Sequence, residues 1–151
     1  MRSAQLGLLL AFVLSTVSSC VAVDHPGLPW EFNAPRADGY AIDLVDVKPA
    51  PGIRLAAGNS VDFVATVKYS LSIASHGAIV LVFEDENDHS ATPNARPVSQ
   101  RVDSPGGEVN LRERITVPAD AKELRLFIPF VPDGLTHTTG EVTVRYPITR
   151  E

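Results

Sequence analysis

The sequence predicts an all-β protein, a single antiparallel β-sandwich of about seven strands, preceded by a signal peptide and a proline-rich spacer. Beyond residue 40, apolar and polar residues alternate with a period of two, the pattern of strands that bury one face. Proline, glycine, asparagine and aspartate separate these runs and supply the turns. No run has the 3.6-residue period of an amphipathic helix, which excludes parallel α/β folds, because their crossover connections need helices.

The chain begins with a segment that has the features of a signal peptide. Arg2 supplies a positive charge, and residues 6–14 form an apolar stretch. This stretch is shorter than the roughly 20 apolar residues of a membrane-spanning helix, and polar residues follow it directly. We therefore expect residues 1–19 to be a signal peptide, residues 20–39 a spacer and residues 40–151 one domain.

The spacer contains three prolines between residues 24 and 39, which bias its backbone to extended conformations. Trp30 and Phe32 are large aromatic residues within it. They could dock on the domain, insert at a membrane interface or form a small binding epitope, and the sequence leaves these three alternatives open.

The alternating runs locate the strands. In the second run, Val61, Phe63 and Val67 share one face, while Asp62 and Lys68 lie on the other. The same alternation continues to the end of the domain. The predicted strands cover residues 40–47, 61–69, 78–83, 98–102, 109–117, 124–131 and 142–148.

Two of the strands have features that predict their place in a sheet. Residues 78–83 are apolar on both faces, so we expect a central strand. Glu113 is the one charge on the apolar face of its strand, which predicts a position near a sheet margin.

Two other strands are expected at sheet edges. Residues 98–102 form a weak apolar run. Residues 142–148 contain Pro147, which has no amide donor for a ladder and restricts this strand to an edge or a bulge. Pro97 and Pro147 would then limit uncontrolled pairing with other strands.

The end of the leader, Val17-Ser18-Ser19-Cys20, resembles the lipobox of bacterial lipoproteins, and Cys20 is the only cysteine. The resemblance implies that the Cys20 thiolate takes a lipid and that two or three acyl chains hold the protein on a membrane. Val21 follows instead of the aspartate that favours inner-membrane retention, so the resemblance implies the outer membrane in a Gram-negative cell. The alternative is cleavage after Ala22, which would give a periplasmic or secreted protein.

A second resemblance covers the domain itself. The stretch from Gly58 to Tyr69 reads G-x-x-V-x-F-x-x-x-V-x-Y. It resembles the second strand of immunoglobulin-like and fibronectin-III-like domains of exported bacterial proteins. The resemblance implies an immunoglobulin-like sandwich over about residues 40–150, without the cysteine pair of antibody domains.

The only concentration of possible metal ligands is the acidic stretch at residues 84–89. Calcium takes six to eight oxygen ligands, so Glu84, Asp85 and Asp88 are the candidate ligands. The spacing lacks the pattern of a known calcium loop, and the sequence favours a solvated loop. The four histidines have no spacing of zinc ligands and stand at positions 25, 76, 89 and 137.

The function predicted from these observations is a membrane-tethered, non-enzymatic lipoprotein of the cell envelope, acting as a protein-interaction or structural module. No catalytic motif occurs, so we expect neither an enzyme nor a cofactor. The net charge of −5 argues against a nucleic-acid partner. The partners expected are the membrane, through the lipid, and an envelope or extracellular protein that contacts a loop or a sheet edge.

Two alternatives for the function stay open. The first is a small-ligand or calcium-binding lipoprotein that uses the acidic stretch at residues 84–89. The second is a secreted protease inhibitor with the immunoglobulin fold, in which residues 88–97 would form the protruding loop.

Overall fold

The computed structural model describes residues 30–32, 39–93, 95–136 and 140–150. This part of the chain contains strands and no helix, so none of it forms a helix that could cross a membrane. The strands are β1 (Trp30–Phe32), β2 (Tyr40–Lys48), β3 (Leu55–Ala56), β4 (Ser60–Leu71), β5 (His76–Asp85), β6 (Val98–Asp103), β7 (Gly106–Thr116), β8 (Glu123–Pro132) and β9 (Gly140–Thr149).

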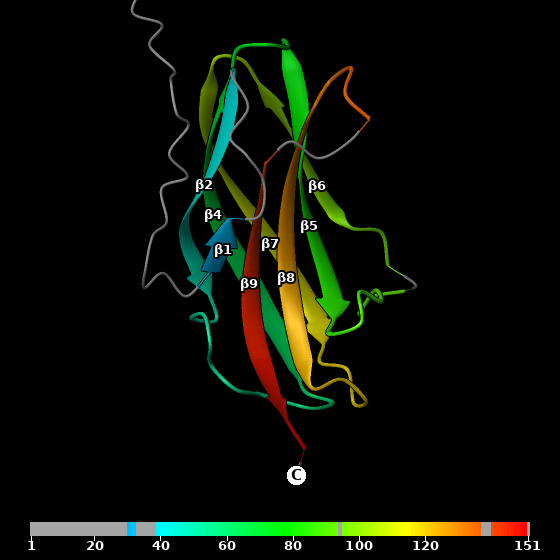
Figure 1. Ribbon diagram of the computed structural model, residues 1–151. Helices are drawn as coiled ribbons and strands as arrows, with labels where there is room; N and C mark the ends of the chain where they lie inside the picture. The colour runs from blue at the N-terminus through cyan, green and yellow to red at the C-terminus, as the bar shows by residue number, and fades with distance from the viewer. Residues whose placement is uncertain (1–29, 33–38, 94, 137–139, 151) are drawn as a thin grey trace, which may run out of the picture.

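The strands form two sheets, and the larger sheet lies in front of the smaller one in Figure 1. The larger sheet has the order β1-β9-β8-β5-β6, with the short β3 also paired to β9, and the smaller sheet has the order β2-β4-β7. All pairs are antiparallel except β3 with β9. The prediction of an antiparallel β-sandwich is confirmed, with seven long strands and two short ones.

In the seven-stranded immunoglobulin fold the first, second, fourth and fifth strands form one sheet. The long strands of this chain divide in the same way, except that the fourth, β6, lies in the other sheet next to the third, β5. The first, second and fifth of them (β2, β4 and β7) form one sheet, and the third, fourth, sixth and seventh (β5, β6, β8 and β9) belong to the other. The stretch Gly58–Tyr69 leads into β4, which is the second long strand, as its resemblance implies.

The core lies between the sheets, because alternate side chains of each long strand point inward. At its centre the ring of Phe63 on β4 lies 4.8 Å from that of Phe83 on β5 and 5.3 Å from that of Tyr146 on β9, measured between centroids. The Tyr146 hydroxyl donates a hydrogen bond to the carbonyl of Pro49 at 2.9 Å, so this buried polar group is satisfied.

Two of the predicted strand positions are confirmed. Residues 78–83 lie in β5, between β8 and β6. Residues 98–102 lie in β6, which ends the larger sheet.

The prediction that the last strand, with Ile148, is an edge is wrong. β9 lies inside the sheet, with β8 on one side and the short strands β1 and β3 on the other. Pro147 is tolerated because the Ile148 N–H donates to the Lys122 carbonyl beside β8 at 2.8 Å. Successive amides alternate in direction, so the Pro147 nitrogen faces the opposite side, between the residues that pair with β1 and β3.

The backbone of Trp30–Phe32 pairs with residues 142–144 of β9. The backbone of this segment is therefore docked on the domain, which is one of the three alternatives that the sequence left open. Cys20 and the rest of the leader, the other spacer residues before Gly39, His25 and His137 lie outside the described residues.

Candidate functional site

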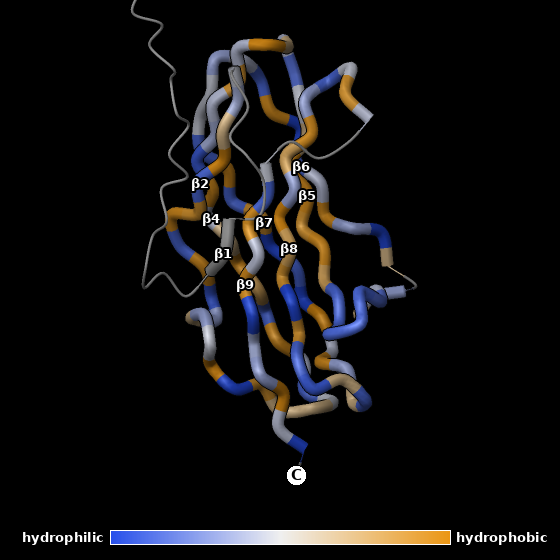
Figure 2. The backbone as a smooth tube through the Cα atoms, in the orientation of Figure 1, coloured by the Kyte–Doolittle hydropathy of each residue, from blue (hydrophilic) through white to orange (hydrophobic). Residues whose placement is uncertain are grey.

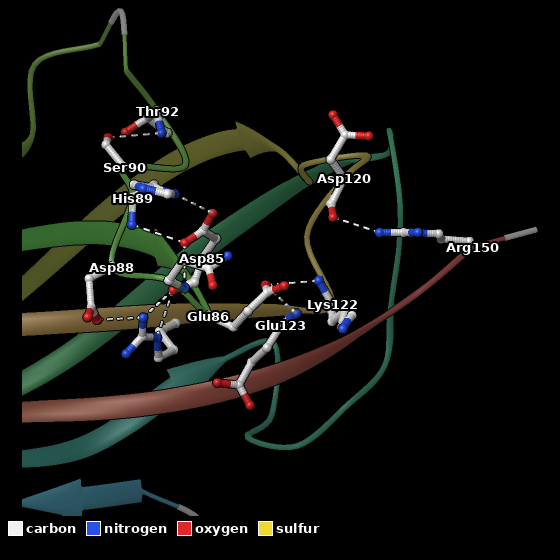
Figure 3. Close-up of polar contacts among 12 residues, drawn as sticks. Asp85, Glu86, Asp88, His89, Ser90, Thr92, Asp120, Lys122, Glu123 and Arg150 are labelled. Atoms are coloured by element: carbon white, nitrogen blue, oxygen red, sulfur yellow. Dashed lines mark hydrogen bonds and ion pairs between the residues drawn. The ribbon is translucent and has the colours of Figure 1, made fainter.

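The acidic loop after β5 folds around one of its own carboxylates, that of Asp85 (Figure 3). Asp85 Oδ1 accepts hydrogen bonds from the backbone N–H groups of His89, at 3.0 Å, and Asn87, at 2.7 Å. These two hydrogen bonds hold the pKa of Asp85 below its ordinary value of 3.8, and the one from the His89 N–H has the larger effect. Between them the chain turns through Asp88, whose φ of 63° is left-handed.

The other carboxylates of the loop have different partners. Glu86 Oε2 accepts hydrogen bonds from the backbone N–H groups of Lys122, at 3.0 Å, and Glu123, at 3.4 Å, and so links the loop to the start of β8. Asp88 Oδ1 lies 2.7 Å from Nη2 of Arg125, which is also on β8. These contacts dock the loop on the neighbouring strand.

The three residues of the calcium alternative do not share a site. Glu84 belongs to the outer face of β5, Asp85 binds backbone amides, and Asp88 pairs with Arg125. In the ranges that the structure describes, no group of three or more His, Cys, Asp or Glu side chains is arranged to hold a metal ion. The geometry favours a loop that uses its carboxylates for its own closure.

We expect Asp85→Asn to lower the melting temperature at pH 7, because an amide oxygen accepts the two N–H groups more weakly than a carboxylate. The folded-state pKa of Asp85 is lowered, so its contribution is present above the ordinary pKa of 3.8 and is lost as pH falls further. Thermal unfolding at pH 7 and pH 3 should therefore show a difference from the parent at pH 7 that shrinks at pH 3.

The matched control is Asp120→Asn, since the side chain of Asp120 has no hydrogen-bond partner among the described residues and only its carbonyl is bonded, to Arg150 (Figure 3). It should leave the melting temperature unchanged at both pH values. Millimolar calcium should also leave the parent unchanged, and a clear rise that Asp85→Asn abolishes would favour the calcium alternative.

The described histidines do not form a catalytic group. His76 Nδ1 lies 2.7 Å from Asp103 Oδ1, with both side chains well exposed. This pair lines a shallow, open depression that also contains three serines. The hydroxyls of Ser72 and Ser104 donate to the backbone carbonyls of Gly39 and Leu71, so neither is hydrogen-bonded to the imidazole.

On the outer face of β5 and β8, six apolar side chains form a continuous patch, the outer apolar patch. The large apolar side chains that are most exposed among the described residues, Val45, Ile53 and Ile73, lie elsewhere. Five of the patch side chains are half-buried and one, Pro129, is buried against its neighbours. They form three rows across the two strands, since Val82 pairs with Phe127 and Ala78 with Val131 in one continuous register. The patch consists of Ala78, Val80, Val82, Phe127, Pro129 and Val131.

The outer face of the larger sheet, which carries the outer apolar patch, is the face turned away from the smaller sheet (Figure 1). Hydrophobic residues, of the core as well as of the patch, follow one another along the middle of β5 and β8 (Figure 2). The outer face of the smaller sheet is different in character. There Thr66 donates to Asn110 Oδ1 at 2.7 Å, and Asp62 forms an ion pair with Arg114. The outer face of the smaller sheet thus carries these polar pairs, whereas that of the larger sheet is apolar on the middle of β5 and β8.

Charged side chains surround the patch. Arg145 pairs with Glu123 at 2.7 Å beyond one end, and Arg101 pairs with Asp133 at 2.8 Å beyond the other. Along the flank on β9, partial burial and the nearby charge of Glu84 raise the pKa of Glu141. An apolar centre with a charged rim is the composition of a protein-protein interface.

The exposed edge of the larger sheet, β6, has side chains of the other sheet bound to both of its ends. Near its start, the Glu113 carboxylate accepts a hydrogen bond from the Val98 N–H. At its end, the Tyr69 hydroxyl accepts from the Asp103 N–H at 3.3 Å and donates to the Asp103 carbonyl at 3.1 Å. These contacts reduce the backbone groups that β6 offers to an added strand.

Glu113 lies on β7, which is an edge strand of the smaller sheet, as its charge predicted. Its second oxygen, Oε2, is buried and has no hydrogen-bond partner among the residues that the structure describes. Burial raises the pKa of Glu113 above its ordinary value of 4.5, although the hydrogen bond from Val98 acts in the opposite direction.

We expect Glu113→Gln to raise the free energy of unfolding by about 1 kcal/mol at pH 8, because glutamine keeps an acceptor for Val98 and removes a poorly solvated charge. A raised folded-state pKa favours the protonated form, so the parent loses stability as pH rises through that pKa and regains it below 4.5. Denaturant unfolding at pH 8 and pH 4 should show a gain at pH 8 that is much smaller at pH 4. The control, Glu108→Gln, changes an exposed glutamate of the same strand and should leave the free energy of unfolding unchanged. A Glu113→Gln protein that is less stable than the parent at pH 8 would contradict this account.

Comparisons with known proteins give little further guidance. No protein-family model matches the sequence, and no curated protein matches it. Ten chains of solved structures match the fold. One is the CARDB domain of the PF1109 protein from Pyrococcus furiosus, in complex with di-metal ions, with 9% sequence identity, a TM-score of 0.45, and coverage of 80% of this chain and 89% of that one.

The outer apolar patch was not among the sites predicted from the sequence, although a signal for it was present. Residues 78–83 are apolar on both faces of their strand. In the run at 124–131, Phe127, Pro129 and Val131 are apolar residues on the face opposite to the one that carries Leu124, Leu126 and Ile128. A central strand of a two-layer sandwich needs only one apolar face, the one that packs on the core. Two strands that are apolar on both faces therefore indicated an apolar region on the outer surface of the sheet.

Proposed function

We propose that this chain is a non-enzymatic interaction module of the bacterial cell envelope and that it binds a protein partner through the outer apolar patch. The observation that carries the proposal is the apolar outer face of β5 and β8 within a rim of ion pairs. A contiguous apolar patch in a polar rim is costly to leave in water and is typical of binding surfaces.

The face of the sheet is a better binding surface than its edge. The outer edge of β6 is short and engaged at both ends by Glu113 and Tyr69. The acidic loop, which the calcium alternative would use, has its carboxylates bound to backbone amides and to Arg125. The loop of the protease-inhibitor alternative, residues 88–97, returns to β5, where the Ala91 N–H donates to the Phe83 carbonyl at 2.8 Å. Neither alternative gains a specific observation from the structure.

The proposal includes a membrane tether. Residues 1–19 would be removed on export, Cys20 would carry the lipid, and residues 20–39 would connect it to the domain. The pairing of Trp30–Phe32 with β9 would shorten this connection and hold the domain close to the membrane. In a Gram-negative cell the expected location is the outer membrane.

The tether can be tested by growing cells with a fatty-acid analogue and comparing the parent with Cys20→Ala. We expect the parent to be labelled and to sediment with membranes, and Cys20→Ala to be unlabelled. A parent chain that begins at Val23, free of lipid and soluble in the exported fraction, would instead establish cleavage after Ala22.

The binding surface can be tested in cells of the source organism with a photo-crosslinking amino acid at Val80, in the centre of the patch. The matched control is Val64, which is also half-buried but lies on the polar outer face of the smaller sheet. We expect discrete adducts from position 80 and none from position 64. The absence of adducts at position 80, with the protein folded and exported, would overturn the proposed surface.

A further inference from the structure

We propose that the partner of the outer apolar patch is a second copy of this chain, related by a two-fold axis that runs along the strands between β5 and β8. This inference rests on the proposed function, since it names the occupant of the same surface. It follows from the way in which the rows of the patch are arranged.

Rotation about a two-fold axis in this position places β5 of one copy opposite β8 of the other. Because the axis is parallel to the strands, each row keeps its position along the strands and faces the same row of the other copy. The register pairs Val82 with Phe127 and Ala78 with Val131 within one chain. In the pair of copies, Val82 of one chain would therefore face Phe127 of the other, and the remaining rows would match in the same way. Every apolar side chain of the patch would meet another apolar side chain.

The charges next to the patch are compatible with this axis, because it places no two like charges of the Glu84–Arg125 row opposite each other. Glu84 pairs in register with Arg125, so the axis places Glu84 of one copy opposite Arg125 of the other. Within one chain the charge of Glu84 lies near Glu141, whose pKa it helps to raise. Within its own chain Arg125 is already paired with Asp88 and bonded to the Asp85 carbonyl, so its contact with Glu84 of the other copy adds little to the association.

The outer strands complete the pattern, because the same axis exchanges β9 with β6. Glu141 is level with Pro129 on β8, and Ser99 is level with Val80 on β5. Glu141 of one copy would therefore lie opposite Ser99 of the other, next to Arg101 on the same face. Stacked sheets of this kind pack about 10 Å apart, within reach of these side chains.

The size of the face predicts a weak association. The four strands β5, β6, β8 and β9 have 10, 6, 10 and 10 residues. With about 4.8 Å between strands and about 3.3 Å per residue, their face covers roughly 570 Å² per copy. Standard interfaces bury about 800 Å² per partner, so we expect a dissociation constant in the micromolar range or above. Two copies tethered to one membrane would meet at a high effective concentration, which makes a weak contact sufficient.

The test uses the full chain as exported and processed by the expression host, in a non-ionic detergent that holds any acyl chains, analysed by sedimentation velocity over about 1 to 1,000 µM. The parent should pass from monomer to dimer in this range. Val82→Glu and Phe127→Lys should each weaken association at least about tenfold, because each places a charge opposite an apolar side chain. Val64→Glu, the control on the other sheet, should associate as the parent does.

The decisive sample is an equimolar mixture of Val82→Glu and Phe127→Lys chains. The proposed axis places the new glutamate opposite the new lysine in the mixed pair and leaves the second Val82–Phe127 contact intact. We therefore expect the mixture to associate within about tenfold of the parent although neither variant does so alone. Circular dichroism melts of each variant establish that it is folded.

A parent that stays monomeric throughout this range, or a mixture that does not regain association, would overturn the inference. The photo-crosslinking experiment separates this result from a failure of the proposed function. Adducts at position 80 with twice the mass of the chain support the second copy. Adducts of other masses, with a monomeric parent, would retain the surface and assign it to a different protein.

Discussion

Replacing Phe63 by alanine is expected to lower the free energy of unfolding by about 3–5 kcal/mol, a large part of the stability of a domain of this size. Phe63 is fully buried, and its ring lies between those of Phe83 and Tyr146. Removing it leaves a cavity that strands from both sheets line, and such a cavity cannot collapse without moving one sheet relative to the other. Denaturant unfolding measures the loss directly.

The matched substitution is Phe127→Ala, which removes the same ring from the outer face of the larger sheet. Phe127 is half-buried, so we expect a loss of about 1 kcal/mol or less together with weaker self-association. Equal losses for the two substitutions would contradict the division between core and outer face.

Replacing Gly106 by alanine is expected to cost about 2–4 kcal/mol. Gly106 begins β7 opposite Ser70, with a φ of 152°, and a Cβ atom there would lie 2.5 Å from the carbonyl oxygen of Tyr69. That oxygen belongs to the backbone of β4 and cannot move without breaking the ladder between β4 and β7. Thermal and denaturant unfolding should both show the loss.

Gly58→Ala is the control that separates backbone conformation from steric contact. Gly58 also has a positive φ, of 77°, but no atom of the described part of the chain lies within 4 Å of the Cβ position. Its replacement should cost only the conformational strain, about 1 kcal/mol. If both alanine variants lost the same stability, the contact with Tyr69 would not be the cause.

Most of the fold could be predicted because the alternation of apolar and polar residues is a local signal. The alternation at 61–69 correctly placed Phe63 and Val67 in the core, and both are fully buried on β4. The position of β9 could not be predicted in this way. Its outer neighbours β1 and β3 are three and two residues long, too short for alternation to be recognised.

The acidic loop illustrates a second limit. A sequence shows how many carboxylates a loop contains but not which donors they meet. Glu86 binds amides at Lys122 and Glu123, which reach it only because β5 and β8 pair in the folded chain. The hydrogen bonds that hold Glu86 of this loop therefore depend on the pairing of β5 with β8 in the sheet.

By itself, the sequence determined that this chain is an all-strand sandwich, which side chains form its interior and which strand is central, because each of these follows from patterns within a few neighbouring residues. Only the tertiary structure decided which strands lie next to one another. Val82 and Phe127 are far apart in the chain and become neighbours through the pairing of β5 with β8. That pairing joins two short apolar runs into one surface, because a binding face is a property of adjacent strands and not of either strand alone.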